Sequence, residues 1–479
     1  MNAALAVVGL VFALSITLGL LAHRGIVMNL EQWTLGGRGF GALFVFLLMA
    51  GEIYTTFTFL GGSGWAYGRG AAAFYIPCYG ALAYTMSYFL LPAIWRYATE
   101  HRLVSQADFF VAKYDSRGLG ILVAVVSVVA LLPYLVLQLK GLGIIVSEVS
   151  YGTISPAVAV WASTAALIAY VVVSGIRGSA WTAVLKDILI LAVAVGLGVY
   201  MPLHYHGSYQ TMFETIDRAH PGLLVLPARG RSAWWFCSTV ALTALGFYMW
   251  PHTFASTYTA RHETVFRKNA VVLPLYQLIV LFVFFTGFAA ILQVPGLKGS
   301  EADLSLLRIS KQTFGPWIVG LIGAAGVLTA IVPGSMMLLS ASTILAQNVY
   351  RPVSRRATDR SVSLLARTLV PIVALVAVLL TLRQNQAIVG LLLMGYNLVT
   401  QLFPALLLSL GRVPLATRIG AFCGILAGEL TVAYLTVSGA TLATLMPGAP
   451  QGVKDLNEGV VALGVNVLVL TIVSVVGRQ

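Results

Sequence analysis

Thirteen segments of about 20 mostly apolar residues run through the chain, and they constrain its fold more than any other feature. Segments of this length cross the bilayer core as helices, because each must satisfy its own backbone hydrogen bonds there. Only 9% of the residues are charged, too few to cover a water-facing surface. We therefore predict an all-α integral membrane protein with one membrane domain over 1–479. Its predicted spans are 2–23, 41–66, 71–98, 117–148, 156–173, 180–203, 234–254, 269–293, 314–347, 363–382, 386–409, 416–437 and 458–477.

Charge predicts the orientation of these spans. The net charge is +13, and the loops assigned to the cytoplasm carry about twice as many Lys and Arg residues as the external loops. This places the N-terminus outside and the C-terminus inside, in a multi-pass protein of a bacterial inner membrane. The basic residues are spread over many short loops, which argues against a nucleic-acid partner. Those assigned to the cytoplasm include Arg351, Arg355, Arg356 and Arg360.

The three cysteines, Cys78, Cys237 and Cys423, lie in apolar stretches without CxxC spacing. They are typical of small buried hydrophobic residues, so we expect no metal site and no cofactor. HExxH, GxSxG and P-loop motifs do not occur, which argues against an enzyme or a primary pump.

Two spans contain helix-breaking residues among polar ones. The second holds Gly51 and Glu52 near its centre, and the seventh reads Gly246 to His252. Such sequences suit helices that unwind around a polar cavity. Their five-span spacing predicts inverted repeats over 41–203 and 234–409, with the substrate where the broken helices meet. Span 2–23 then leads the repeats, and 416–477 holds two trailing spans.

Five motifs occur along the chain in this order: Gly36-Gly37-Arg38, Gly61 to Gly68, Gln138-Leu139-Lys140-Gly141, Ser174 to Gly178 with Trp181-Thr182, and Ser340 to Ile344 ending at Tyr350. Together they resemble the sodium:solute symporter family, and this resemblance implies a LeuT-like fold with ten core helices in two inverted five-helix repeats. The stretch from Leu132 to Gly143 is similar to bacterial monocarboxylate permeases, which implies a substrate such as lactate, pyruvate or propionate.

The resemblance also implies an ion site, built from backbone carbonyls of Gly51, Tyr54 and Ala330 and from two adjacent hydroxyls. Here the hydroxyl positions fall on Pro333 and Gly334, which have no side-chain oxygen.

Lys186 stands close to this ion site on the fifth core helix. We expect its ammonium to replace the sodium ion, so that protonation couples transport. Two alternatives stay open: Lys186 snorkels to the headgroups, or sodium is held through Ser335 and Thr182.

Glu52 lies near the membrane midplane, where a carboxyl group is costly unless it is paired, protonated or functional. We expect it to serve proton coupling or to tie the broken helix together. Lys140 is a candidate for holding a substrate carboxylate, and pairing with Glu148 or outward snorkelling are its alternatives. His252 suits either a hydrogen-bonded interior histidine or a proton carrier.

The remaining candidates for substrate contact lie on the two broken helices and on the tenth core helix. The threonines offer hydroxyl donors beside a half-helix N-terminus, and the aromatic residues alternatively serve as packing and gates. These candidates are Thr55, Thr56, Thr58, Tyr248, Trp250, Tyr396, Asn397 and Gln401.

The sequence therefore predicts a secondary active symporter that imports a small carboxylate with a proton by alternating access, its other partner being membrane lipid. A sodium-coupled symporter of an amino acid or sugar is one alternative, and a membrane-embedded sensor is another.

Overall fold

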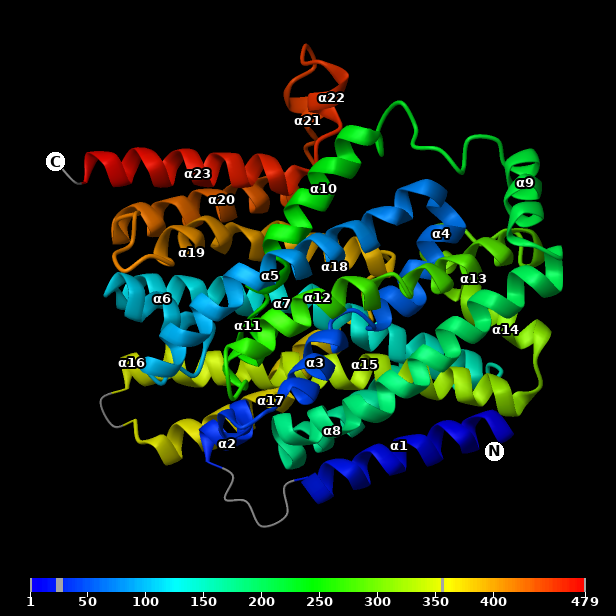
Figure 1. Ribbon diagram of the computed structural model, residues 1–479, viewed down its shortest axis with the longest axis horizontal. Coiled ribbons are helices and arrows are strands. Elements are labelled where there is room, and N and C mark those ends of the chain that lie inside the picture. The colour runs from blue at the N-terminus through cyan, green and yellow to red at the C-terminus, as the bar shows by residue number, and fades with distance from the viewer. Residues whose placement is uncertain (1, 23–28, 355–356, 478–479) are drawn as a thin grey trace.

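The computed structural model describes residues 2–22, 29–354 and 357–477 (Figure 1). The secondary structure of these residues is helical. Within these ranges the exception is an isolated bridge between Phe40 and Ala260. Arg355 and Arg356, assigned above to a cytoplasmic loop, and position 23 of the first predicted span lie outside the described residues. The predicted all-α fold class is confirmed.

Each predicted span coincides with a helix, with a group of consecutive helices or, for the fifth and sixth spans, with a part of α8. The second, seventh, eighth and eleventh spans are divided into shorter pieces. In chain order the elements are α1 (Ala3–Ala22), α3 (Ala42–Gly51) with η2 (Phe57–Gly62) and α4 (Ser63–Arg69), α5 (Tyr75–Glu100), α7 (Arg117–Val149), α8 (Pro156–His206), α10 (Ala233–Gly246) with η4 (Phe247–Met249) and α11 (Pro251–Tyr258), α12 (Thr264–Gln277) with α13 (Val280–Gln293), α15 (Pro316–Ile344), α17 (Asp359–Thr381), α18 (Ile388–Val399) with η7 (Thr400–Leu402) and α19 (Phe403–Ser409), α20 (Arg418–Ser438) and α23 (Glu458–Val476).

Nine helices within the described ranges are long and apolar enough to cross a membrane. Three further apolar helices are shorter: Ala3–Gly19, Ala42–Gly51 and Ala233–Met249. The last two belong to spans that the structure interrupts, which is why each piece alone is too short. The count of thirteen crossings and the orientation stay predictions.

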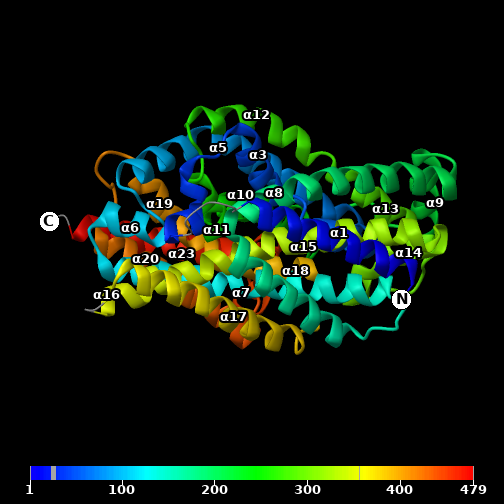
Figure 2. The ribbon, with the colours of Figure 1, turned by 90° about the horizontal axis from the view of Figure 1, so that it is seen from below.

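Many of the long helices run roughly along one axis, and several shorter elements lie at its two ends, whereas α21 and α22 project above the middle of the bundle in Figure 1 (Figures 1 and 2). Helix α1 begins at the end where α9 and α14 lie, here called the α9 end. Helix α23 finishes at the opposite end, beside α6 and α16, here called the α6 end. The shorter elements are α2 (Leu30–Leu35), η1 (Gly36–Arg38), η3 (Gly70–Phe74), α6 (Gln106–Tyr114), α9 (Tyr209–Ala219), η5 (Gly299–Leu304), α14 (Ser305–Thr313), η6 (Leu345–Tyr350), α16 (Arg351–Val353), α21 (Leu442–Leu445) and α22 (Gln451–Lys454).

Helix α8 contains the fifth and sixth predicted spans, and its helical conformation is interrupted at Gly175, where φ is 55° and ψ is −157°. A Cβ at this position would come within 2.8 Å of the Trp33 carbonyl oxygen. Glycine is therefore required here both for the positive φ and for the close approach of α2.

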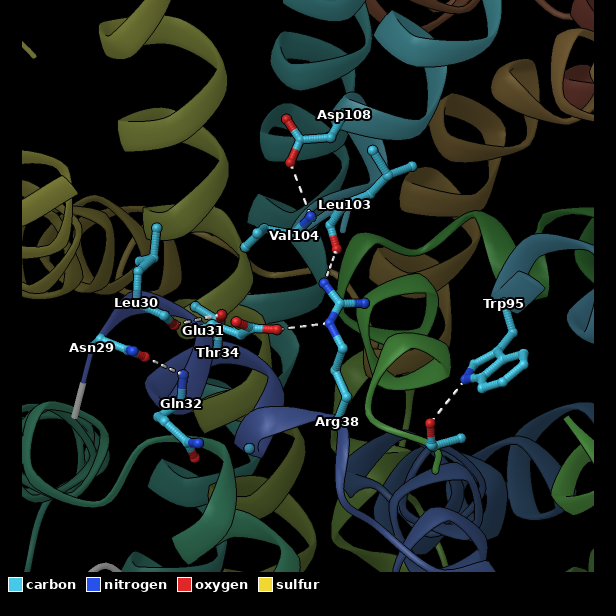
Figure 3. A network of polar contacts seen from close by, with 12 residues as sticks. Asn29, Leu30, Glu31, Gln32, Thr34, Arg38, Trp95, Leu103, Val104 and Asp108 are labelled. Atoms are coloured by element: carbon cyan, nitrogen blue, oxygen red, sulfur yellow. Dashed lines mark hydrogen bonds and ion pairs between the residues drawn. The ribbon is translucent and has the colours of Figure 1, made fainter. Parts of the chain in front are cut away.

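Near the α6 end, Arg38 joins η1 to the segment before α6 (Figure 3). Its Nη2 donates to the Leu103 carbonyl at 2.6 Å, and its Nε lies 2.7 Å from a Glu31 carboxylate oxygen. Asp108 accepts hydrogen bonds from the backbone N–H groups of Val104 and Ser105, both at 3.1 Å. The loop before α6 is thus fixed to η1, the turn that precedes α3, and the start of α6 is fixed to that loop.

Candidate substrate and ion-coupling site

The first predicted interruption is present, because α3 ends at Gly51 and helical structure resumes only near Phe57. The Thr58 hydroxyl donates to the Ile53 carbonyl at 2.6 Å, and the Thr55 hydroxyl accepts from the Phe57 N–H at 3.1 Å. These bonds satisfy backbone groups that the lost helical turn leaves without partners. Two of the predicted substrate-binding threonines therefore stabilise the break itself.

Thr56, the third of these threonines, faces α7. Its buried hydroxyl donates to the Gln138 side-chain oxygen. Gly141, also on α7, packs so closely that a Cβ there would lie 1.8 Å from the Thr56 methyl group. Helix α7 is thus held against the interrupted segment by one hydrogen bond and one glycine contact.

The second predicted interruption lies between α10 and α11. The chain passes through the short 3₁₀ turn η4 and then through Trp250, which is extended with φ −60° and ψ 127°. Pro251 then begins α11, as expected for a residue without an N–H. The two broken helices of the sequence analysis are therefore both broken in the structure.

Aromatic rings surround this second break. The ring centroid of Trp250 lies 4.8 Å from that of Tyr134 on α7 and 5.2 Å from that of Tyr396 on α18. Tyr248 packs edge-on against Phe247. All of these residues are buried, so the aromatic candidates form a packed cluster between α7, η4 and α18.

The two breaks are joined by a hydrogen bond between side chains. His252 Nε2 on α11 lies 2.9 Å from Glu52 Oε2, and both side chains are buried. Both groups are strongly polar, and a buried polar pair of this kind stabilises only when both partners are present. Glu52 thus holds the first interruption to the first turn of α11.

Lys186 of α8 is fully buried, and its Nζ lies 3.0 Å from Oδ1 of Asp187, which is also buried. A Cβ at Gly51 would lie 3.4 Å from the same Nζ. The ammonium therefore sits beside the end of α3. A snorkelling lysine would expose its ammonium, so that alternative for Lys186 is wrong.

Gly51 and Glu52 are adjacent, so the Glu52–His252 hydrogen bond and the Lys186–Asp187 ion pair both lie beside the end of α3. Tyr54, two residues further on, is fixed by a hydrogen bond from its hydroxyl to the Tyr276 carbonyl at 3.1 Å. Titratable groups from α3, α8 and α11 are thus collected around one unwound turn. Such an arrangement is able to move a proton or to exchange a salt-bridge partner.

The groups proposed for the sodium alternative are engaged within the protein. The Ser335 hydroxyl on α15 donates to the Val332 carbonyl and lies 2.7 Å from the Ser179 hydroxyl. The Thr182 hydroxyl accepts from Tyr170 at 2.8 Å. Ala330 is buried on the same helix as Ser335.

Two candidates lie away from the breaks. Lys140 donates through Nζ to the Gln386 carbonyl, in the loop before α18. Glu148, its predicted alternative partner, instead pairs with Lys311 at 2.8 Å, so a Lys140–Glu148 pair does not form. Asn397 is close to α23, where a Cβ on Gly459 would lie 2.5 Å from its Oδ1.

Two residues of α7 without a predicted role contact the broken helices: Gln138 accepts from Thr56 at the first break, and Tyr134 packs against Trp250 at the second. A signal for Gln138 existed, since an amide in the middle of an apolar span needs a buried partner. No comparable local signal marks Tyr134.

Comparison with known proteins identifies the class. The profile of the sodium:solute symporter family matches residues 33–428. The chain is 61% identical to the Bacillus subtilis (strain 168) protein called uncharacterized symporter YhjB, over 100% of this chain and 98% of that protein. The chain therefore belongs to the sodium:solute symporter family, as its motifs predicted.

Two further relatives add detail. The monocarboxylate transport permease protein of Rhizobium johnstonii is 28% identical, over 85% of this chain and 83% of that protein. A solved structure of a Na⁺-coupled sialic acid symporter in a substrate-bound, outward-open state superposes with a TM-score of 0.79 at 18% identity, covering 99% of this chain and 98% of the other. The chain thus has the fold of that symporter and is a multi-pass membrane transporter.

Proposed function

We propose that the chain imports a small monocarboxylate of the lactate, pyruvate or propionate type together with a proton, by alternating access. The relative named as a monocarboxylate transport permease supports the substrate class. The start of α1 and the end of α23 lie at opposite ends of the bundle, which agrees with an odd number of crossings. The distribution of Lys and Arg favours an N-terminus on the outside. The α9 end is then external and the α6 end is cytoplasmic.

The observation that carries this proposal is the buried ammonium of Lys186 beside Gly51. The family resemblance places a sodium ion near this carbonyl. The ammonium takes up the space beside this carbonyl and repels a sodium ion there; two unit charges about 4 Å apart cost several kcal/mol at an effective dielectric of about 20, less the part that Asp187 offsets. Pro333 and Gly334 also supply no side-chain oxygen for a hard cation.

The pair also offers a physical reason for coupling. Lys186 and Asp187 together are neutral, so they are stable inside the membrane domain. A proton added to Asp187 leaves the lysine charge without its partner, which is costly in a buried site. A carboxylate substrate bound nearby restores neutrality. Proton and substrate therefore favour each other's binding, and neither is stable in the site alone.

The test is uptake of labelled lactate, pyruvate and propionate into proteoliposomes, with proton and sodium gradients imposed separately. We expect the proton gradient alone to drive accumulation and the sodium gradient alone to drive none. Removal of the lysine side chain in Lys186→Ala should abolish gradient-driven uptake. Sodium-driven uptake with a Lys186 variant that behaves as wild type would overturn proton coupling in favour of the sodium alternative.

Two variants separate function from folding. Lys186→Ala leaves Asp187 buried and unpaired, which costs roughly 3–5 kcal/mol and threatens the fold. The double variant Lys186→Met with Asp187→Asn removes both charges at nearly constant volume. It should fold and exchange substrate across the membrane without concentrating it. Gradient-driven accumulation by this double variant would show that the pair does not couple transport.

A further inference from the structure

A cavity of about 470 Å³ opens at the α9 end, away from the buried pairs. It lies between the last turns of α4, the η5 segment and the loop before α18. Its size suits a small organic ligand. The charged side chains that line it are Arg69, Arg231, Lys298 and Asp303.

The charges of this cavity are unbalanced, with three cations and one carboxylate. One oxygen of that carboxylate is engaged, because Asp303 Oδ2 accepts the Ile388 N–H at 3.0 Å, and the Lys140 charge lies near the group. In the part of the chain that the structure describes, no carboxylate lies within 4.0 Å of the cationic nitrogens of Arg69, Arg231 or Lys298. A cavity lined in this way attracts anions.

Arg231 is held in a fixed position by aromatic rings. Its guanidinium lies 5.3 Å from the ring centroid of Trp65 and 6.0 Å from that of Trp235. The two indoles stack with centroids 5.8 Å apart. Stacking uses the face of a guanidinium and leaves its N–H edge free for a carboxylate. Burial, and then the nearby Arg69 charge, lower the pKa of Arg231, so an anion between the two arginines would relieve their repulsion.

The loop that carries Arg231 is anchored at both sides. The Ala71 N–H donates to the Leu223 carbonyl at 3.0 Å, and Gly70 makes room because a Cβ there would lie 1.8 Å from that same oxygen. Asp455 accepts the Gly230 N–H at 2.9 Å, so this carboxylate is committed to the backbone beside Arg231. The loop that carries Arg231 is thus built into the fold, and Arg69 reaches the cavity from the last turn of α4.

We infer that Arg69 and Arg231 form an anion-binding site that captures the carboxylate of the substrate at the external mouth, before it reaches the broken helices. This inference rests on the proposed function for the identity of the substrate. It adds that selection for a carboxylate begins in this cavity. The pair acts on substrate capture, so it sets the KM of uptake and leaves the maximal rate nearly unchanged.

Uptake and fluorescence together test the inference. Arg69→Gln and Arg231→Gln should each raise the KM for lactate about tenfold, with the maximal rate within twofold of wild type. Potassium lactate added to the purified full-length protein should change the tryptophan fluorescence through Trp65 and Trp235, beyond the change given by potassium chloride at equal ionic strength. Arg231→Gln should lose this response.

The matched control is Arg383→Gln, an exposed arginine in the loop before α18 that does not line the cavity. It should keep the wild-type KM and fluorescence response. The Lys186→Met, Asp187→Asn variant should keep the fluorescence response, because the two sites are separate. A wild type that transports no monocarboxylate but still shows an Arg231-dependent response would overturn the proposed function alone. An unchanged KM and response in Arg231→Gln would overturn the capture site, as would equal losses in Arg383→Gln.

Discussion

At the scale of single residues, the protein buries charges in pairs. Glu52 pairs with His252 of α11, and Lys186 pairs with its neighbour Asp187 on α8; both pairs lie near the unwound turn after α3. The sequence made Glu52 and Lys186 conspicuous, because each is a charged residue inside an apolar span. It did not indicate that Glu52 pairs with a histidine 200 residues away. Pairing at such separation depends on how the helices pack, which no local pattern encodes.

Helical periodicity separates two of the predicted substrate contacts, Tyr396 and Asn397 on α18. Tyr396 and Asn397 were both predicted to contact substrate, yet neighbouring helical residues point about 100° apart. In the structure Tyr396 contacts Trp250, whereas Asn397 lies against α23. Helical register alone therefore argues against Tyr396 and Asn397 facing the same cavity.

Asp303 provides a pH-dependent prediction outside the membrane-spanning helices. Burial raises its pKa from 3.8 to about 6, although the Ile388 N–H and the Lys140 charge both act to lower it. Between about pH 4 and pH 6 the folded protein then binds more protons at this site than the unfolded chain. The stability that this contributes is complete below about pH 4 and is lost as the pH rises through 6, by roughly 3 kcal/mol at most.

Asp303→Asn should therefore lack this loss, because an amide oxygen still accepts the Ile388 N–H and does not ionise. The measurement is the Tm of detergent-purified protein from pH 4.5 to 7, with Glu301→Gln as an exposed control on the same segment. The Tm of Asp303→Asn should rise relative to wild type as the pH increases. A constant difference across this range would show that Asp303 does not titrate there.

At the scale of elements, helix-breaking residues were the most reliable guide. Gly51 ends α3, and Pro251 begins α11 after the extended Trp250, so both interruptions fall where glycine and proline predicted them. The details came from packing. The Thr58 hydroxyl bonds the backbone of the first break, and Gly141 lets α7 approach that break closely. Composition predicts neither contact.

The contact between α7 and the first break predicts a sharp effect of one methyl group. Gly141→Ala places a Cβ against the Thr56 methyl, with 1.8 Å between the two carbons unless α7 moves. Overpacking of this kind costs roughly 1–3 kcal/mol. We expect a lower Tm and a lower rate of substrate uptake, because the Thr56–Gln138 hydrogen bond would be displaced.

Gly118→Ala is the matched control, since it lies on the same helix and a Cβ there meets nothing within 4 Å. Its Tm and uptake should match wild type closely. Equal behaviour of the two alanine variants would mean that α7 is free to shift without affecting the break.

At the scale of the whole molecule, hydropathy located the long apolar helices, and the family motifs pointed to the correct class. What hydropathy does not show is which pieces cross fully, because a span divided at a polar break falls below the length of a crossing helix. The arrangement of the helices in Figure 1 does not by itself distinguish an outer from an inner side. Orientation therefore depends on the distribution of Lys and Arg.

This orientation predicts which surfaces a membrane-impermeant maleimide reaches in intact cells. Asp217 is exposed on α9, and Arg412 is exposed in the loop between α19 and α20, where Lys113 of α6 donates to the Gly411 carbonyl. With the three native cysteines replaced by alanine, Asp217→Cys should be labelled in intact cells. Arg412→Cys should react only after the membrane is permeabilised. Both positions lie outside the apolar helices, so lipid does not protect either, and the difference reports sidedness alone. The reverse pattern would invert the assignment of outside and inside, and with it the external position of the arginine-lined cavity.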